Sequence, residues 1–139
     1  ISLVLKSDDA RNKSGIEGST VHDCGYPEGG GMHGGLHECE VRTWLAMQGA
    51  GIRSAYRSPI PAGNVDILPT VLHLLDLEIP PHIQGRLLAE ALDAFSSIEL
   101  PKCIEERHTA TGIDGYRAHI ILDRLDKHRY LRRAWREDT

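Results

Sequence analysis

The sequence predicts an α/β fold that ends in a carboxyl-terminal antiparallel hairpin. Three observations support this class. Apolar residues recur at helical spacing in three segments, short strand-like runs lie between them, and two β-prone runs flank a turn near the end of the chain. The expected order is therefore strand, helix, strand, helix, helix and hairpin.

The first elements surround a long glycine-bearing segment. The letters ISLVLK indicate a strand at residues 2–5 that is already under way where the sequence starts, and a polar loop is expected over residues 7–35. A loop of this length inside a compact domain is usually functional. A helix is expected from about residue 36 to residue 48, because apolar side chains recur there at helical spacing and Gly49 follows.

The middle of the chain predicts one more strand and a well-marked helix. Residues 55–59 can form the strand. The helix is expected to start at Asn64 or Asp66, either of which can cap it, and to continue through Asp76. Pro69 fits this helix only within its first turn, where no backbone N–H is needed.

The last third of the chain predicts a helix and the hairpin. A third helix is expected from Gly85 to about residue 95, and residues 96–113 show no clear pattern. The runs YRAHIILD and HRYLRRAW flank the turn-like LDRLDK. We expect residues 1–95 to supply an α/β core portion and residues 96–139 a linker and the hairpin.

Composition restricts the class of partner. The net charge of −4 gives no general electrostatic reason to bind nucleic acid, and no apolar stretch is long enough to span a membrane. We expect a soluble chain whose cellular compartment is open. Three cysteines exclude a complete disulfide framework, although one bridge between Cys24 and Cys39 remains an alternative.

The segment GGGMHGGLHECE concentrates soft metal ligands on a pliable backbone. Glycines flank His33 on both sides, where larger side chains would crowd anything that the imidazole holds. The spacing of the candidate ligands matches no established structural zinc motif, although a small structural zinc domain stays an alternative. The candidate ligands are His22, Cys24, His33, His37 and Cys39.

The remaining histidines have simpler interpretations. His73, in the letters VLHLLDL, is expected on the polar face or core edge of its helix. His82, His108, His119 and His128 have no second candidate ligand nearby in sequence and are expected to be solvated.

Three ordered blocks resemble a known family. They are the G-x-H-G loop leading into G-x-G-I, the run PAGNVDILPTVLHLL, and GRLLAEAL, which together span residues 29–92. The sequence is similar here to the carboxyl-terminal catalytic segment of the alkaline phosphatase superfamily, in the type I phosphodiesterase and nucleotide pyrophosphatase branch. The resemblance implies part of an α/β/α sandwich and places residues 1–139 at the carboxyl-terminal end of such a hydrolase domain.

The resemblance also assigns roles to individual residues. The histidine of the G-x-H-G loop binds one ion of a two-metal site in that family, usually zinc, and this role falls on His33. His37 matches no role in the family and is a second candidate for metal contact by its residue type. The other ring nitrogen of a ligand histidine needs a hydrogen-bond partner, for which Glu38 or a backbone carbonyl is a candidate. Asn64 and Asp66 lie in the second block, where the resemblance implies capping and packing.

The family's nucleophile and its other metal ligands have no counterpart in this sequence, because they lie upstream of this segment in the family. We therefore expect the intact parent to hydrolyse phosphodiesters or related small phosphate esters with two divalent ions, and this chain alone to be inactive and to hold metal weakly or not at all. Its expected partner is the missing amino-terminal part of the same domain, and a homo-oligomer is another means of covering its exposed sheet edge. A stand-alone, non-catalytic binding module derived from the same fold remains the competing hypothesis.

Overall fold

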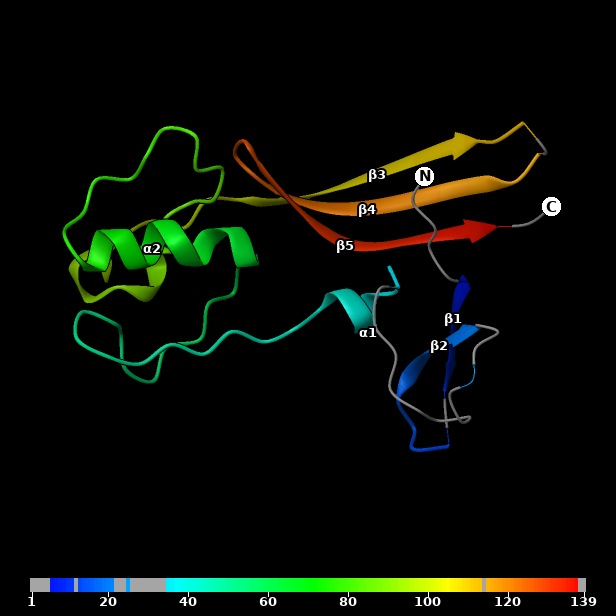
Figure 1. Cartoon of the computed structure of the whole chain (residues 1–139), viewed down its shortest axis with the longest axis horizontal. Helices are drawn as coiled ribbons and strands as arrows, with labels where there is room; N and C mark the ends of the chain where they lie inside the picture. The colour runs from blue at the N-terminus through cyan, green and yellow to red at the C-terminus, as the bar shows by residue number, and fades with distance from the viewer. Residues whose placement is uncertain (1–5, 12, 22–24, 26–34, 114, 138–139) are drawn as a thin grey trace. The chain divides into compact units, whose positions relative to one another are not determined.

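The computed structural model describes residues 6–11, 13–21, 25, 35–113 and 115–137 (Figure 1). The chain divides into two compact units. Unit 1 contains Ile1–Trp44, Glu105–Leu122 and Leu131–Thr139, and unit 2 contains Leu45–Ile104 and Asp123–Tyr130. No helix in the described part of the chain is long and apolar enough to cross a membrane. The strand predicted at residues 2–5 lies outside the described residues.

Unit 1 contains a short antiparallel hairpin, β1 (Lys6–Arg11) and β2 (Glu17–Val21). Asp8 pairs with Ser19 and Arg11 with Glu17, and the register shifts between those two pairs. The loop predicted over residues 7–35 is therefore wrong in its first part. The strands KSDDAR and EGSTV lack the alternating apolar residues that mark a half-buried strand, and backbone pairing forms the hairpin without that pattern.

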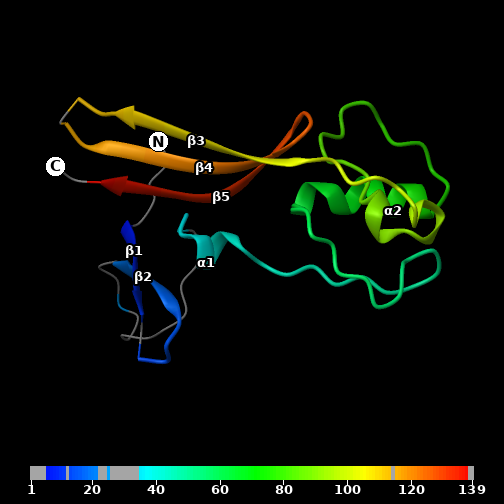
Figure 2. The same cartoon turned by 180° about the vertical axis from the view of Figure 1, so that it is seen from behind.

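The one-turn helix α1 (Glu38–Val41) lies against β2, as Figures 1 and 2 both show. Its amino-terminal end carries a capping box, in which the His37 ring accepts from the backbone N–H of Cys39 and the Glu40 carboxylate accepts from that of His37. The helix predicted over residues 36–48 is too long. Arg42 has extended dihedral angles, and Trp44 beyond it is 86% exposed, so no burial of the apolar stripe supports further turns.

Unit 2 contains the predicted central helix. A 3-10 turn, η1 (Asn64–Asp66), leads into α2 (Ile67–Leu74), which ends two residues before the predicted limit. Pro69 lies in the first turn, as the sequence requires. The predicted helix is thus confirmed closely in its bounds and in the place of Pro69. Asp66 makes no side-chain capping hydrogen bond to α2, and its carboxylate instead caps η1 by accepting from the Gly63 N–H.

The strand at 55–59 and the helix from Gly85 are both wrong. The first segment has no regular structure, and the second forms only the 3-10 turns η2 (Ala89–Ala91) and η3 (Asp93–Phe95). Tertiary hydrogen bonds replace helical ones, since the Leu88 N–H donates to the Thr70 hydroxyl and Leu92 forms an antiparallel bridge with Ile52. Leu88 and Leu92 are nevertheless buried, so their apolar character correctly indicated core positions.

A three-stranded sheet completes the fold, in the order β3 (Cys103–Thr111), β4 (Arg117–Leu125) and β5 (His128–Glu137). Successive strands run in opposite directions in Figure 1. The predicted hairpin is confirmed as β4 and β5, joined through Asp126 at a φ of 50°, a conformation that aspartate tolerates. Strand β3 was not predicted, because its side chains are nearly all exposed and show no period-two burial. The α/β/α sandwich of the parent stays a prediction.

Candidate functional site

The predicted ligand residues fall into two groups. His22, Cys24 and His33 lie outside the described residues, so the metal role of His33 stays a prediction. His37 and Cys39 are described, and both belong to the start of α1. Cys39 is a free thiol in the structure. The geometry around these two residues defines the described part of the candidate site.

His37 is 5% exposed and uses both of its ring nitrogens within the protein. Its Nδ1 lies 3.2 Å from the backbone nitrogen of Cys39 and 3.1 Å from the Cys39 sulfur. Its Nε2 lies 2.7 Å from Oδ1 of Asp9. Because Nδ1 accepts the capping N–H, we assign the proton to Nε2, which donates to the carboxylate.

Asp9 is the site residue that sequence reasoning missed. It lies on β1, twenty-eight positions from His37 along the chain, and only the packing of the hairpin against α1 brings the two together. The hydrogen bond from His37 lowers the pKa of Asp9, and the Arg133 guanidinium, whose Nη2 lies 3.5 Å from Oδ1, lowers it further. Asp9 therefore presents a carboxylate to the imidazole at neutral pH.

Cys39 lies in an acidic setting. Burial of its sulfur raises the pKa of the thiol, and the negative charge of Glu40 raises it further. The residue as a whole is exposed, but its sulfur lies against Gly18, which has a φ of 94° and no side chain to displace it. A Cβ atom at position 18 would collide with the Cys39 sulfur and approach Nδ1 of His37 to 2.8 Å.

The residues of this site do not by themselves provide a metal centre. Among the described residues, no group of three or more His, Cys, Asp or Glu side chains is placed to hold one ion. A metal role for His37 would require replacement of the Asp9 or Cys39 contact. Glu38 forms an ion pair with Arg42 at 2.8 Å, and its predicted role beside His33 stays a prediction.

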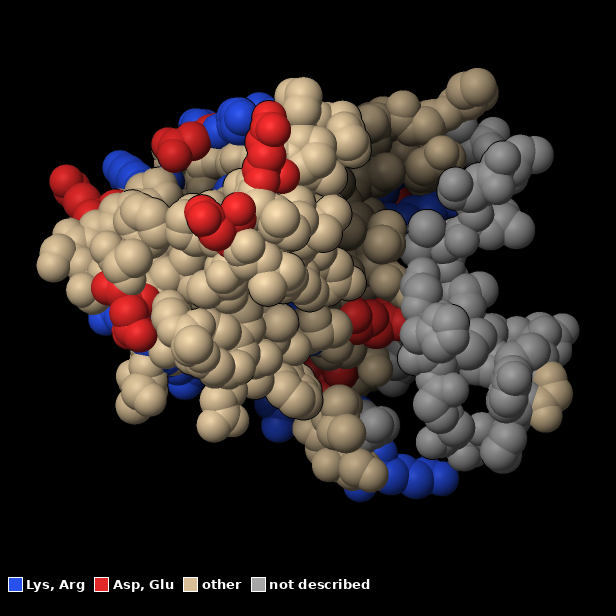
Figure 3. Space-filling model, turned by 60° about the vertical axis from the view of Figure 1, so that its left-hand side comes forward, with Lys and Arg blue, Asp and Glu red and all other residues tan. Residues whose placement is uncertain are grey.

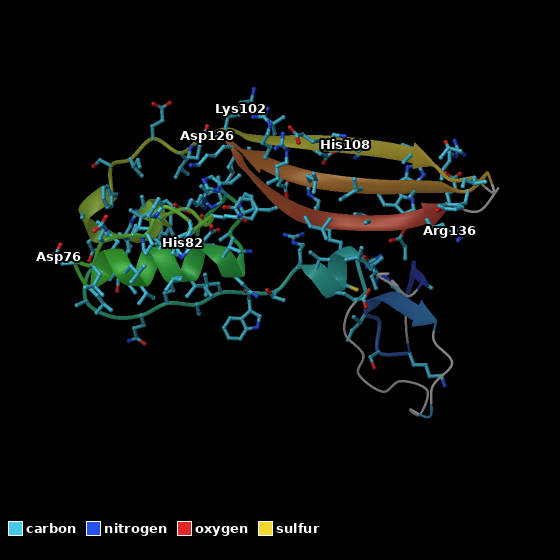
Figure 4. All side chains as sticks on the ribbon, turned by 45° about the horizontal axis from the view of Figure 1, so that its top comes forward. Asp76, His82, Lys102, His108, Asp126 and Arg136 are labelled. Carbon is cyan, nitrogen blue, oxygen red and sulfur yellow. The ribbon has the colours of Figure 1, made fainter. Side chains whose placement is uncertain are left out.

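The remaining histidines are mostly peripheral, as expected. His73 packs its ring against Phe95 with centroids 5.6 Å apart, while His82 beside α2 and His108 on β3 are exposed (Figure 4). The expectation for His119 is wrong. Its ring stacks on Trp135, and its nitrogens lie 2.9 Å from the Thr109 hydroxyl and 3.1 Å from Glu137. These partners come from neighbouring strands, which sequence spacing did not reveal.

Unit 2 contains a separate buried polar network centred on Asp66, which is 0% exposed. Its Oδ2 accepts from the Gly63 N–H at 2.8 Å and from the Tyr130 hydroxyl at 2.9 Å. Its Oδ1 accepts from the Arg86 N–H at 2.8 Å. Asp66 therefore packs as implied and caps the turn η1, not α2 itself, and every partner of this carboxylate is a donor.

Arg86 connects the carboxylate of Asp66 to a second carboxylate, that of Glu90. Its guanidinium donates two hydrogen bonds of 2.8 Å to Glu90, one to the Tyr130 hydroxyl at 3.0 Å and one to the Pro61 carbonyl at 2.9 Å. Burial acts to raise the pKa of Glu90, but the hydrogen bonds from Arg86, a backbone hydrogen bond and the charge of Arg86 together lower that pKa. The network is fully paired, so it is suited to holding loops together and not to binding a substrate.

One comparison with known proteins points to hydrolases of the alkaline phosphatase superfamily. Over 64 residues, 46% of this chain, the sequence is 33% identical to arylsulfatase K from Mus musculus, a sulfatase of that superfamily. The aligned stretch spans 12% of that relative's length. No family model and no solved structure matches the sequence. This similarity supports the resemblance to the alkaline phosphatase superfamily but does not identify a branch of it.

Proposed function

We propose that these residues form the carboxyl-terminal portion of a hydrolase of the alkaline phosphatase superfamily that cleaves phosphodiesters or related esters. The observation that carries the proposal is the similarity to arylsulfatase K, which covers 64 residues of this chain and a small part of that sulfatase. The ordered blocks over residues 29–92 support the same superfamily and favour its phosphodiesterase and nucleotide pyrophosphatase branch.

In this proposal His33 supplies one ligand to a pair of divalent ions, most simply zinc. Such ions polarise a bound ester and stabilise the oxygen that leaves. The remaining ligands and the nucleophile come from the part of the domain that precedes this segment. His37, whose ring nitrogens contact Asp9 and Cys39, holds the start of α1 directly after the glycine-rich segment.

An exposed apolar surface in unit 2 supports a missing partner. Leu68 and Val71 lie on α2 and Leu75 follows at its carboxyl-terminal cap, with the spacing of one helix face, and all three are exposed. The side of the molecule that carries α2 shows charged atoms in scattered groups and uncharged residues over most of its area (Figure 3). Exposed apolar groups of this kind mark interaction sites, and we propose that the rest of the same hydrolase domain covers them.

A sulfate-ester hydrolase is the second candidate function. The named relative is an arylsulfatase, which favours a sulfate ester as the alternative substrate. Sulfate and phosphate esters both have a tetrahedral centre that carries charged oxygens and a leaving group attached through oxygen. The same two divalent metal ions can therefore polarise either ester. Parallel assays of the parent with bis-nitrophenyl phosphate and nitrophenyl sulfate separate the two candidates.

The test of the proposal uses the parent protein and the isolated chain. We expect the purified 139-residue chain to hydrolyse neither ester, since it lacks the nucleophile. In the parent, His33→Ala should lower kcat/KM by about 100-fold or more, because loss of a group that only hydrogen-bonds to a metal ligand already costs about 10- to 100-fold. The matched variant His73→Ala removes an imidazole that packs on Phe95 and should retain activity.

Other outcomes identify the competing functions. Chelator-sensitive turnover by the isolated chain would contradict the fragment proposal, and equal losses from the two histidine variants would contradict the ligand role of His33. An immunoblot of the source cells with an antibody to this segment gives the mass of the native polypeptide that contains it. A band near 15.4 kDa would favour a stand-alone binding module, and a band several times heavier would support the hydrolase.

A further inference from the structure

The three-stranded sheet joins one polar side chain from each of its strands, which lie side by side in Figure 1. Thr109 on β3, His119 on β4 and Glu137 on β5 all belong to unit 1, and hydrogen bonds connect them in that order. Nothing in the proposed function uses these residues, which are called the hydroxyl triad below. We propose that Thr109 accepts an acyl group from a small activated carboxylic ester, with His119 as the general base.

The hydrogen bonds of the hydroxyl triad assign the position of each proton. An ionised carboxylate can only accept, so Nε2 of His119, which lies 3.1 Å from Oε2 of Glu137, carries a proton and donates it. In the neutral ring Nδ1 then holds the lone pair, and it accepts from the Thr109 hydroxyl at 2.9 Å. The base therefore already contacts the proton that it must remove, at the distance that general-base catalysis requires.

Two further contacts hold the base and the carboxylate in place. The His119 ring stacks on Trp135, with centroids 4.7 Å apart and an angle of 16° between the planes. Arg117 donates to the other carboxylate oxygen of Glu137 at 2.9 Å, which leaves Oε2 for the imidazole. The side chain of His119 is only 16% exposed, whereas Thr109 is exposed. The base is thus shielded and oriented while the hydroxyl is open to reagents.

The charges beside the hydroxyl triad define the class of reagent. Arg107 and Arg117 lie on two of its strands, and each is ion-paired, with Glu105 at 2.5 Å and with Glu137 at 2.9 Å. Transfer of a phosphoryl group depends on cations that neutralise its oxygens, and these two arginines are already engaged. An uncharged activated ester needs no such clamp, because its leaving group departs readily after attack by the hydroxyl.

The reaction is balanced by the ester itself. As Oγ1 of Thr109 forms a bond to the carbonyl carbon, His119 takes the hydroxyl proton at Nδ1. The bond between the carbonyl carbon and the leaving oxygen then breaks, and the leaving group takes that proton from His119. The products are an O-acyl threonine and one free alcohol or phenol.

The experiment treats the full chain with p-nitrophenyl acetate at pH 7 and measures the rate of acetylation at Thr109 by peptide mass mapping. The mapping separates this site from thiols and amines that the reagent also modifies. His119→Phe keeps a ring that can stack on Trp135 and removes the base. We expect this variant to acetylate Thr109 about 100-fold more slowly, at the lower end of general-base effects because the site is open to solvent.

Matched measurements complete the test. Glu137 is a positioning residue with a side chain that is 49% exposed, and Glu137→Gln keeps an acceptor for Nε2 without disturbing the sheet. It should slow acetylation about tenfold, because the imidazolium loses its counter-charge. Thr109→Ser keeps the hydroxyl and should stay reactive. Thr111, exposed on the same strand and outside the triad, is the internal control and should react far more slowly than Thr109.

The contrary results are equally specific. An unchanged rate at Thr109 in either His119→Phe or Glu137→Gln would overturn the proposal, and so would equal rates at Thr109 and Thr111 in the original chain. Loss of acetylation in Thr109→Ser would show that the hydroxyl is not the nucleophile.

Discussion

At the residue scale, Asp66 shows how a polar side chain becomes part of a core. It is fully buried and accepts hydrogen bonds from a loop glycine, from the backbone of Arg86 and from Tyr130 on β5. Burial of a charge is costly unless each lone pair finds a donor. The three donors meet this requirement and join segments that are far apart in the sequence.

The first prediction concerns Asp66→Asn. The amide group would place an N–H against a donor whichever way it turns, because all three partners donate. We expect a loss of about 1–3 kcal/mol in the free energy of unfolding, measured by urea titration. Asp76→Asn is the matched control, since Asp76 is exposed and its φ of 54° suits asparagine. Equal effects of the two changes would contradict the role assigned to Asp66.

The second prediction concerns the pH dependence of Tyr130. Burial raises the pKa of this phenol to about 12, and the hydrogen bond to Asp66 contributes in the same direction. The folded state therefore favours the protonated form more than the unfolded state does. Its contribution is complete below about pH 10, the unfolded value, and is lost as the pH rises toward 12.

Tyr130→Phe provides the measurement. The difference in unfolding free energy between the original protein and the variant should be constant up to about pH 9 and should shrink between about pH 10 and 12. Chemical denaturation at a series of pH values measures this difference. A gap that widens over that range would show that the phenol is not held in its protonated form.

At the element scale, the turn η1 and the segment at Gly85 approach each other too closely for a side chain. A Cβ atom at position 85 would collide with the backbone carbonyl of Val65, which cannot move without distortion of η1. The neighbouring Arg86 N–H bonds Asp66 at 2.8 Å and fixes this approach. Glycine is required here by space and not by a special backbone angle.

The third prediction is that Gly85→Ala lowers thermal stability by several degrees, as expected for an overpacked site that costs about 1–3 kcal/mol. Gly25→Ala is the control, because nothing lies within 4 Å of the Cβ position there. Differential scanning calorimetry on both variants makes the comparison. Similar melting temperatures for the two variants would mean that the backbone at Val65 moves aside with little loss of stability.

At the scale of the whole molecule, the described core is small. Among the described residues, the buried hydrophobic side chains are Leu88, Leu92, Ile121 and Leu125, while many large apolar residues are exposed. A small buried core beside many exposed apolar side chains favours association with another polypeptide segment, because a small core supplies little stability by itself. It agrees with the proposed dependence on the rest of a larger domain.

The fourth prediction separates this proposal from a structural zinc domain. Treatment of the isolated chain with EDTA should leave its melting temperature unchanged, because the described histidine at the candidate site is held by Asp9 and Cys39. A structural zinc domain would unfold, since its metal-binding free energy is its folding free energy. Loss of the circular dichroism signal on chelation would therefore favour the zinc domain.

Sequence reasoning succeeded where local signals agreed. The α2 helix and the hairpin of β4 and β5 were predicted because capping residues, a proline in the first turn and alternating strands all indicate one conformation. It failed for the helix expected from Gly85. There the apolar spacing marked buried positions, but tertiary hydrogen bonds to Thr70 and Gly51 determined the backbone.

The residues of the candidate site also fall into those that the sequence predicts and those that only the packing brings together. The sequence by itself singled out His33, His37 and Cys39 through their residue types and glycine-rich setting, and its ordered blocks indicated the hydrolase superfamily. Only the tertiary structure brought Asp9 to His37 and Tyr130 to Asp66. The physical reason is that helix caps and turns depend on neighbouring residues, whereas buried hydrogen bonds between distant segments depend on how the whole chain packs.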